Sequence, residues 1–210
     1  MNKPKIALTL NIIAFVLGSI GIIVRIARNI PDFWLYYTQL SNVVAVISSA
    51  MYIAFRSTRN RKLRACVRGM RYLSACGLTM TFIVVMCIFI PFGGASEMIS
   101  RLLGHVNGFM HHLACPLISV TSYIVFEEGV RERRALWLPF GATAVYAFTV
   151  YTLNYFYLAP APYPFFETHD HPVWELALWF FGLMALVAGI AAVIKLANNK
   201  FGGNAKGDLL

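Results

Sequence analysis

The sequence predicts an all-α membrane protein, with six transmembrane helices in one bundle and both termini in the cytoplasm. The composition is 59% hydrophobic and 13% charged, with a mean hydropathy of +0.65, which a water-soluble chain of 210 residues does not normally combine. Apolar stretches of about 20 residues, the length that crosses a bilayer as a helix, recur along the chain. We place them at 6–26, 35–55, 72–92, 106–126, 135–158 and 173–196.

Basic residues predict the orientation of these helices. Lysines and arginines cluster before the first stretch, in the connections 56–71 and 127–134, and in the tail, and the exceptions are Arg25, Arg28 and Arg101. Short cytoplasmic loops carry an excess of Lys and Arg, so the clusters are expected on the cytoplasmic side. The net charge of +9 then reflects membrane topology, and no nucleic-acid partner is implied.

The chain is expected to form one transmembrane domain over residues 1–198, followed by a disordered cytoplasmic tail over 199–210. The first apolar stretch follows Lys3 and Lys5 as in a signal peptide, but no small-residue cleavage site precedes Arg25. We therefore expect that stretch to be retained as a helix.

Polar residues within the predicted helices point to the outer end of the bundle. Thr38, Ser41 and Asn42 stand at i, i+3 and i+4, which is one face of the second helix. Asn107 and His111 are four apart on the fourth helix. Unpaired polar groups are costly in hydrocarbon, so these side chains should face the bundle interior. At 1.5 Å per residue, Thr38 and His111 lie at matching depths below one membrane face.

A proline follows the histidines of the fourth helix. Pro116 lacks an N–H for the helical ladder, so we expect a kink just beneath His111 and His112. We interpret His112 as a contact within the bundle or with substrate. Arg25 is a second candidate for substrate binding, although its long side chain could instead extend to the interface.

Three sequence blocks, taken together, resemble one family. They are Thr38 near the outer start of the second helix, an Asn-x-x-Met-His-x-x-x-x-Pro pattern from Asn107 to Pro116, and Tyr-Pro-Phe-x-Glu from Tyr163 to Glu167. This order resembles the androgen-induced and ADTRP-like six-span proteins and their bacterial six-span relatives, over most of the chain. The Gln-Leu-Ser-Asn that follows Thr38 looks more like the bacterial branch. The resemblance therefore implies a bacterial inner (plasma) membrane.

The resemblance also implies an activity, the hydrolysis within the membrane of fatty-acid esters, with Thr38 as nucleophile and His111 as base. A threonine hydroxyl attacks well only when a base takes its proton, and a neutral imidazole within hydrogen-bond reach does this near pH 7. The expected partners are membrane lipids and a lipid ester, and no cofactor is implied.

Such a mechanism needs further groups. The imidazole needs an orienting partner, for which Asn107, Glu167 and Asp170 are candidates. The developing oxyanion needs donors, each contributing about 3–4 kcal/mol when well placed. Gln39, Asn42 and Tyr163 are the candidates for this role.

Two alternatives remain open from the residues alone. A zinc-dependent membrane hydrolase would use the outer histidines and leave one position for water. The candidate ligands are His105, His111, His112, His169, Asp170 and His171. The second alternative is a non-enzymatic lipid-binding protein or transporter that uses the same polar residues for recognition.

Overall fold

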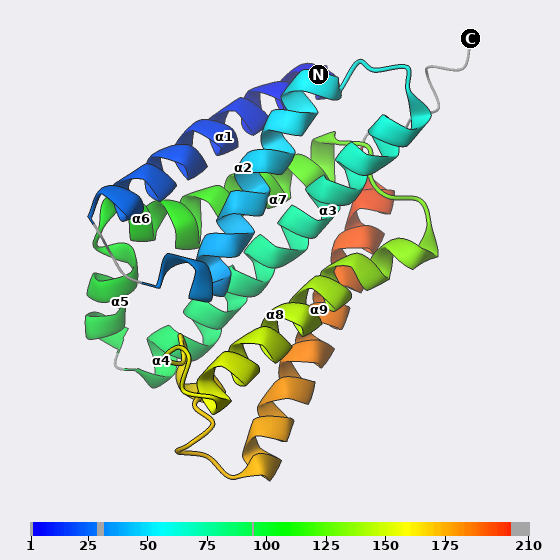
Figure 1. Ribbon diagram of the computed structural model, residues 1–210. Helices are drawn as coiled ribbons and strands as arrows, with labels where there is room; N and C mark the ends of the chain where they lie inside the picture. Colours follow the sequence, from blue (N-terminus) through cyan, green and yellow to red (C-terminus); the bar gives the residue numbers. More distant parts are fainter. Residues whose placement is uncertain (1, 29–31, 94, 203–210) are drawn as a thin grey trace.

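A computed structural model describes residues 2–28, 32–93 and 95–202, whose regular structure is entirely helical (Figure 1). Within them, six helical runs are long and apolar enough to cross a membrane, which makes this an integral membrane protein. These runs are α1 (Lys3–Ala27), α2 (Tyr37–Phe55), α3 with η2 and α4 (Arg61–Ile83, Val84–Phe89, Ile90–Phe92), α6 with η3, α7 and η4 (Val106–Phe109, Met110–Ala114, Cys115–Thr121, Ser122–Phe126), η5 with α8 (Arg133–Leu136, Trp137–Tyr155), and α9 (Val173–Phe201).

The predicted spans agree with these runs to within a few residues, except in one place. The third run begins at Arg61, because the Asn60 side chain accepts hydrogen bonds from the backbone of Lys62 and Leu63 and caps the helix. Much of the predicted connection 56–71 is therefore the first part of α3. A short helix, α5 (Ala95–Leu103), which the sequence reading did not include, joins the third and fourth runs. Of the predicted tail, residues 203–210 lie outside the described residues, and α9 continues through Phe201.

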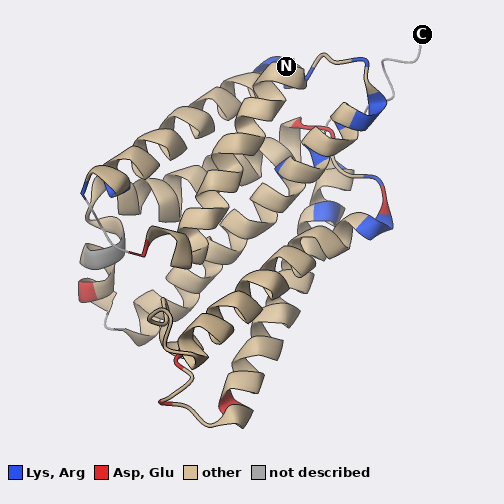
Figure 2. Ribbon diagram, in the orientation of Figure 1, with Lys and Arg blue, Asp and Glu red and all other residues tan. Residues whose placement is uncertain are grey.

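The two ends of the bundle differ in charge. Figure 2 shows most lysines and arginines at the end where the N-terminus lies. The Lys3 ammonium donates hydrogen bonds to the carbonyls of Phe201 (2.7 Å) and Gly202 (3.3 Å), so α1 and α9 bring both described chain ends together there. We call this the basic end, defined by Lys3 and the segments 56–71 and 127–134. The connections from α1 to α2, from α4 to α6 and from α8 to α9 form the opposite end.

Helix α1 packs closely on its neighbours because its inner face consists mostly of small residues. Ala7, Asn11, Ala14, Gly18 and Gly21 are buried at alternating spacings of four and three. Small residues at such spacings let helix backbones approach one another in a membrane. A methyl group on Gly18 would lie 2.7 Å from a Val46 methyl on α2, which shows how little room remains.

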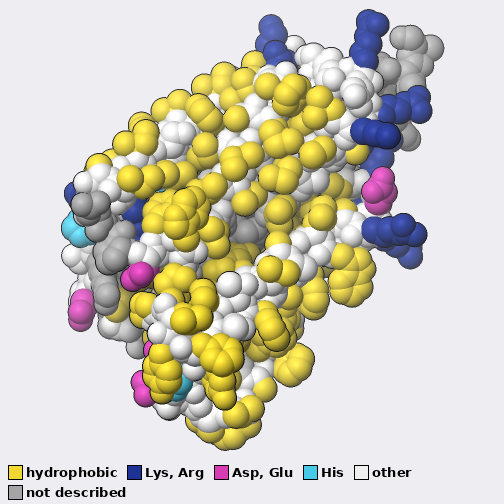
Figure 3. Space-filling view, viewed as in Figure 1, with side chains coloured by type: hydrophobic (Ala, Val, Ile, Leu, Met, Phe, Trp, Pro, Cys, Tyr) yellow, Lys and Arg dark blue, Asp and Glu magenta, His cyan; other side chains and the backbone are white. Residues whose placement is uncertain are grey.

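The outer surface of the bundle is apolar along its length. Phe148 on α8 and Phe181 on α9 are 72% and 68% exposed, and Figure 3 shows hydrophobic side chains covering the helices between the charged ends. The interior of the bundle holds a cluster of buried apolar side chains around Tyr72, Tyr123 and Val187. Exposed apolar surface of this extent fits a chain whose solvent is lipid.

A buried ion pair lies inside the bundle near the basic end. Arg71 on α3 and Glu127, just after η4, are 1% and 2% exposed and are joined by two hydrogen bonds of 2.9 and 2.8 Å. Arg71 also donates to the hydroxyls of Ser48, Ser49 and Ser119. Arg71 was expected in the connection 56–71 and instead lies buried within α3, because Glu127 and three serine hydroxyls accept hydrogen bonds from its guanidinium.

Candidate functional site

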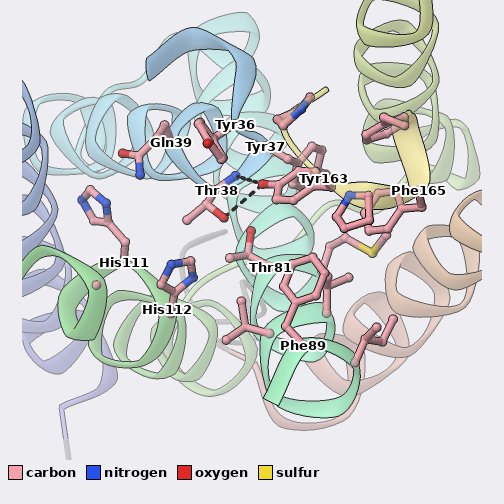
Figure 4. Close-up of a pocket in the computed structure, with 18 of the residues that line it drawn as sticks. Tyr36, Tyr37, Thr38, Gln39, Thr81, Phe89, His111, His112, Tyr163 and Phe165 are labelled. Atoms are coloured by element: carbon pink, nitrogen blue, oxygen red, sulfur yellow. Dashed lines mark hydrogen bonds between the residues drawn. The ribbon is translucent and has the colours of Figure 1, made fainter. Parts of the chain in front are cut away.

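A cavity of about 830 Å³ opens at the end opposite the basic end. Its polar part is lined by Thr38, His111 and His112, and its apolar part by Phe89 of η2, by Phe165 of the connection from α8 to α9, and by side chains of α3, α8 and α9. Figure 4 shows Thr38 and Gln39 on α2 facing His111 and His112 across the cavity. The cavity is thus amphipathic, with hydroxyl and imidazole groups beside an apolar hollow.

Thr38 lies in the first turn of α2 and is only 6% exposed. The Tyr163 hydroxyl lies 3.4 Å from both the Thr38 backbone nitrogen and the Thr38 hydroxyl oxygen (Figure 4). The first backbone N–H groups of a helix have no partner within the helix, and this tyrosine supplies one. Since the Tyr163 oxygen accepts from the Thr38 N–H, its own proton is free for the Thr38 oxygen or for a ligand.

Tyr163 belongs to the connection between α8 and α9, just before η6 (Pro164–Phe166). Its ring packs against Phe89 (5.7 Å between centroids), Phe165 (5.3 Å) and the edge of Tyr36 (5.8 Å). Burial raises the pKa of Tyr163 above its usual value, with hydrogen bonds from Thr38 opposing the shift. The phenol therefore stays protonated at neutral pH and remains a hydrogen-bond donor.

His111 lies in η3, a π-helical turn, and is 1% exposed. Its Nε2 lies 3.5 Å from the Gly18 carbonyl of α1, and a methyl group on Gly21 would overlap the same atom. The imidazole thus occupies space that α1 leaves open only because residue 21 is glycine. Nδ1 of His111 is buried and, among the described residues, has no hydrogen-bond partner.

The π-helical turn brings a second histidine to the same cavity. Pro116 has no N–H to bond the His112 carbonyl, and instead the Cys115 N–H bonds the Met110 carbonyl five residues back. The break in regular helical bonding that Pro116 predicts is therefore a π-helical turn. His112 lines the cavity beside His111, and its buried Nδ1 is likewise without a partner within the described chain.

Asn42 joins the backbones that carry Thr38 and His111. Its side-chain amide donates to the Thr38 carbonyl (2.8 Å) and to the His111 carbonyl (3.3 Å). Over residues 2–28, 32–93 and 95–202, neither His111 nor His112 is hydrogen-bonded to the Thr38 hydroxyl. The structure therefore brings the predicted nucleophile and base to one cavity without direct contact. Catalytic hydrogen bonds are often long in ligand-free enzymes.

Other predicted site residues divide into two groups. Gln39, Asn107, Arg25 and His105 line the cavity. The Arg25 guanidinium lies over the Tyr36 ring, 4.9 Å from its centroid, which keeps a positive charge at the cavity mouth. The amide nitrogen of Asn42 is engaged by the two carbonyls, so Asn42 positions the backbone and does not aim a donor at the cavity.

The second group lies away from the cavity, in the connection from α8 to α9. Neither Glu167 nor Asp170 lines it, so these carboxylates do not orient His111 here. His169 bonds the Asn154 carbonyl (3.1 Å), and His171 pairs with Glu175 (3.1 Å). In the described part of the chain, no three side chains of His, Cys, Asp or Glu are placed to hold a metal ion, and the zinc ligands proposed from the sequence are divided between the cavity and this connection.

The structure adds residues that the sequence reading missed. The Thr81 hydroxyl on α3 lines the cavity and lies 3.1 Å from that of Ser41, which itself donates to the Thr38 carbonyl. Gly18 and Gly21 of α1 receive the His111 ring. The sequence does contain an indication for Thr81, because a polar residue within an apolar stretch is expected to face the bundle interior. The glycines were visible only as part of a small-residue stripe.

No protein-family model matches this chain, and no curated protein sequence or solved structure is significantly similar to it.

Proposed function

We propose that this protein is a hydrolase of lipid esters that works within the membrane, with Thr38 as nucleophile and His111 as base. One observation carries the proposal: a buried threonine hydroxyl, a tyrosine hydroxyl in contact with it, and a buried imidazole whose Nδ1 has no partner among the described residues line one amphipathic cavity. The resemblance to the androgen-induced and ADTRP-like six-span proteins leads to the same residues.

In the proposed reaction, His111 Nδ1 takes the proton of Thr38 Oγ while this oxygen forms a bond to the ester carbonyl carbon. The Tyr163 hydroxyl donates to the oxyanion of the tetrahedral intermediate, which lies near the positive end of the α2 helix dipole. Collapse breaks the ester C–O bond, and the imidazolium returns the proton to the leaving alcohol. Water then hydrolyses the acyl-threonine with the same base, releasing the acid and restoring Thr38.

The shape of the cavity supports a lipid substrate. Its polar residues meet an apolar region formed by Phe89, Phe165, Leu183 and Met184, which suits an acyl chain beside an ester group. Arg25 at the mouth suits a carboxylate or phosphate on the substrate. We propose that the ester enters from the outer leaflet, and that the basic end faces the cytoplasm of a bacterial cell.

The decisive test is covalent labelling with a fluorophosphonate, in which the attacking oxygen displaces fluoride from phosphorus. We expect one adduct, mapped by mass spectrometry to Thr38, and loss of adduct and ester turnover in Thr38→Ala. Thr149→Ala is the matched control, because Thr149 lies on α8 outside the cavity and bonds only its own helix in the described structure. An adduct that persists in folded Thr38→Ala would refute the nucleophile.

A lipid-binding protein without turnover is the second candidate, favoured by the lack of contact between Thr38 and His111 within the described residues. It predicts that the purified protein retains a lipid but never hydrolyses an ester. Thr38→Ala would then leave lipid binding unchanged, and His111→Ala would weaken it through the shape of the cavity alone. Quantifying bound lipid and released acid in the same samples separates the two functions.

A further inference from the structure

A second pocket, of about 540 Å³, lies at the basic end and shares no lining residue with the Thr38 cavity. It is formed where the start of α1, the end of α2, the first turns of α3 and the residues after η4 meet. Its basic side chains come from all of the first three elements: Lys3, Arg56, Arg64, Arg68 and Arg71. We call it the basic pocket.

The carboxylates of this pocket are already engaged. Glu127 accepts from Arg71, Asn11 (2.8 Å) and Ser122 (2.6 Å), so its charge and lone pairs are used inside the bundle. Glu128 accepts from Arg68 (2.8 Å) and Arg131 (3.0 Å). Neither carboxylate is left to neutralise the remaining cations.

Positive charge is therefore in excess at the rim. Arg64 donates to the Thr58 carbonyl (3.1 Å), and Arg56, at the end of α2, lines the same pocket. Among the described residues, no carboxylate lies within ion-pair distance of either guanidinium. The floor of the pocket is formed by Arg71, which already donates hydrogen bonds to Glu127 and to serine oxygens. An anion would meet the rim and not the floor.

Membrane topology alone does not explain this arrangement. Positive charge anywhere in a short loop orients a helix, and Arg59, Arg61 and Lys62 of the same segment are exposed and do not line the pocket. Arg56 and Arg64 instead converge on one hollow from two helices. Its walls include the aromatic side chains Tyr52, Phe55 and Phe126, which suit the apolar part of a ligand.

We infer that the basic pocket binds a phosphate group, which Arg56 and Arg64 contact at the rim while acyl chains lie along Phe55 and Phe126. Guanidinium groups form paired, charge-assisted hydrogen bonds with phosphate oxygens. Anionic phospholipids concentrate at the membrane surface to which this end of the helices leads. The ligand is accordingly the phosphate of an anionic lipid head group, with a soluble phosphate ester as the other source of the same chemistry.

The test compares two double variants that lose the same charge. The rim variant, Arg56→Gln/Arg64→Gln, removes the two arginine charges at the rim of the pocket. The control variant, Arg59→Gln/Arg61→Gln, removes two exposed arginines outside the pocket. Binding of short-chain phosphatidylglycerol, phosphatidylcholine and glycerol phosphate is measured on the full chain in zwitterionic detergent, by calorimetric titration or native mass spectrometry. Melting temperatures check that each variant is folded.

We expect phosphatidylglycerol to bind the unmodified chain at least tenfold more tightly than phosphatidylcholine, and the rim variant to lose about tenfold while the control variant loses little. Equal binding of glycerol phosphate would assign the pocket to a soluble phosphate ester. Equal losses in both double variants would show a diffuse charge effect and overturn the site. Equal affinity for the anionic and zwitterionic lipids would overturn it as well.

Discussion

The Tyr163 hydroxyl lies 3.4 Å from both the backbone nitrogen and the hydroxyl oxygen of Thr38. This contact links the connection between α8 and α9 to the start of α2, two segments far apart in the chain. It gives the unpaired N–H at the start of α2 an acceptor and leaves the phenolic proton free for the Thr38 oxygen or for a ligand. Tyr163 is thus the donor whose removal tests the proposed chemistry most directly.

Tyr163→Phe is expected to slow ester turnover by about 10²–10³ and to leave the Michaelis constant nearly unchanged, because an oxyanion donor acts in the transition state. The aromatic contacts with Phe89 and Phe165 are kept in this variant, so its melting temperature should stay close to that of the unmodified chain. Steady-state kinetics with a fatty-acid ester measures both constants.

Tyr157→Phe is the matched control, since Tyr157 follows α8 and is 79% exposed. It should retain full activity. If Tyr163→Phe were equally active, Tyr163 would only fix the loop, and the oxyanion would need another donor such as Gln39.

Gly21→Ala is expected to abolish turnover, because the added methyl group would collide with His111 Nε2 and displace the imidazole. Alanine ordinarily favours a helix over glycine by about 1 kcal/mol, so global unfolding is not the expected cause. Gly189→Ala on α9 serves as the control, because its methyl group would meet nothing within 4 Å. Fluorophosphonate labelling and melting curves are measured on both.

Full activity in Gly21→Ala would mean that His111 does not act from its position against α1. His112, which lines the same cavity, would then become the candidate base. His111→Ala and His112→Ala, assayed side by side, would identify which imidazole the reaction needs.

How far the sequence predicts this site can be judged from α2 and α1. The i, i+3, i+4 spacing of Thr38, Ser41 and Asn42 predicts one polar face, and all three are buried on it. The support for His111 was not predictable in the same way, because it comes from the Gly18 carbonyl and from the missing side chain of Gly21. A backbone carbonyl and a missing side chain do not appear in the sequence as polar residues, so neither could be predicted from a polar pattern.

The Arg71–Glu127 pair was not predicted either, although both of its residues are polar and visible in the sequence. Arg71 follows several arginines that are exposed or partly exposed, and nothing in the local sequence distinguishes the one that turns inward. Its burial depends on serines of α2 and α7 and on a carboxylate 56 positions away. Such a network forms only when several helices are assembled, so the burial of Arg71 cannot be predicted from the sequence of one segment.

Removing one member of this pair should be strongly destabilising. Arg71→Met leaves Glu127 charged and buried without its main partner, and we expect a loss of about 3–5 kcal/mol in the free energy of unfolding. Arg68→Met, which breaks a partly exposed pair with Glu128, should cost about 1 kcal/mol or less. Unfolding in detergent, monitored by circular dichroism, compares them.

The double variant Arg71→Met/Glu127→Met separates charge from packing. If the cost of Arg71→Met comes from the stranded carboxylate, the double variant should be more stable than the single variant. A double variant that loses the sum of both single losses would show that the two side chains act independently.

The orientation of the bundle is the last prediction, and it follows from the charge difference between the ends. Short loops rich in Lys and Arg stay in the cytoplasm, so the basic end should face inward and the Thr38 cavity outward. Cysteines placed at Arg59 and Asp170, both exposed and at opposite ends, report the two faces. Because Cys66 and Cys87 are exposed, both are first replaced by serine. A membrane-impermeant maleimide added to intact cells should label Asp170→Cys at once and Arg59→Cys only after lysis. The reverse pattern would place the cavity at the inner leaflet, and lipid esters would then have to reach Thr38 from the cytoplasmic side.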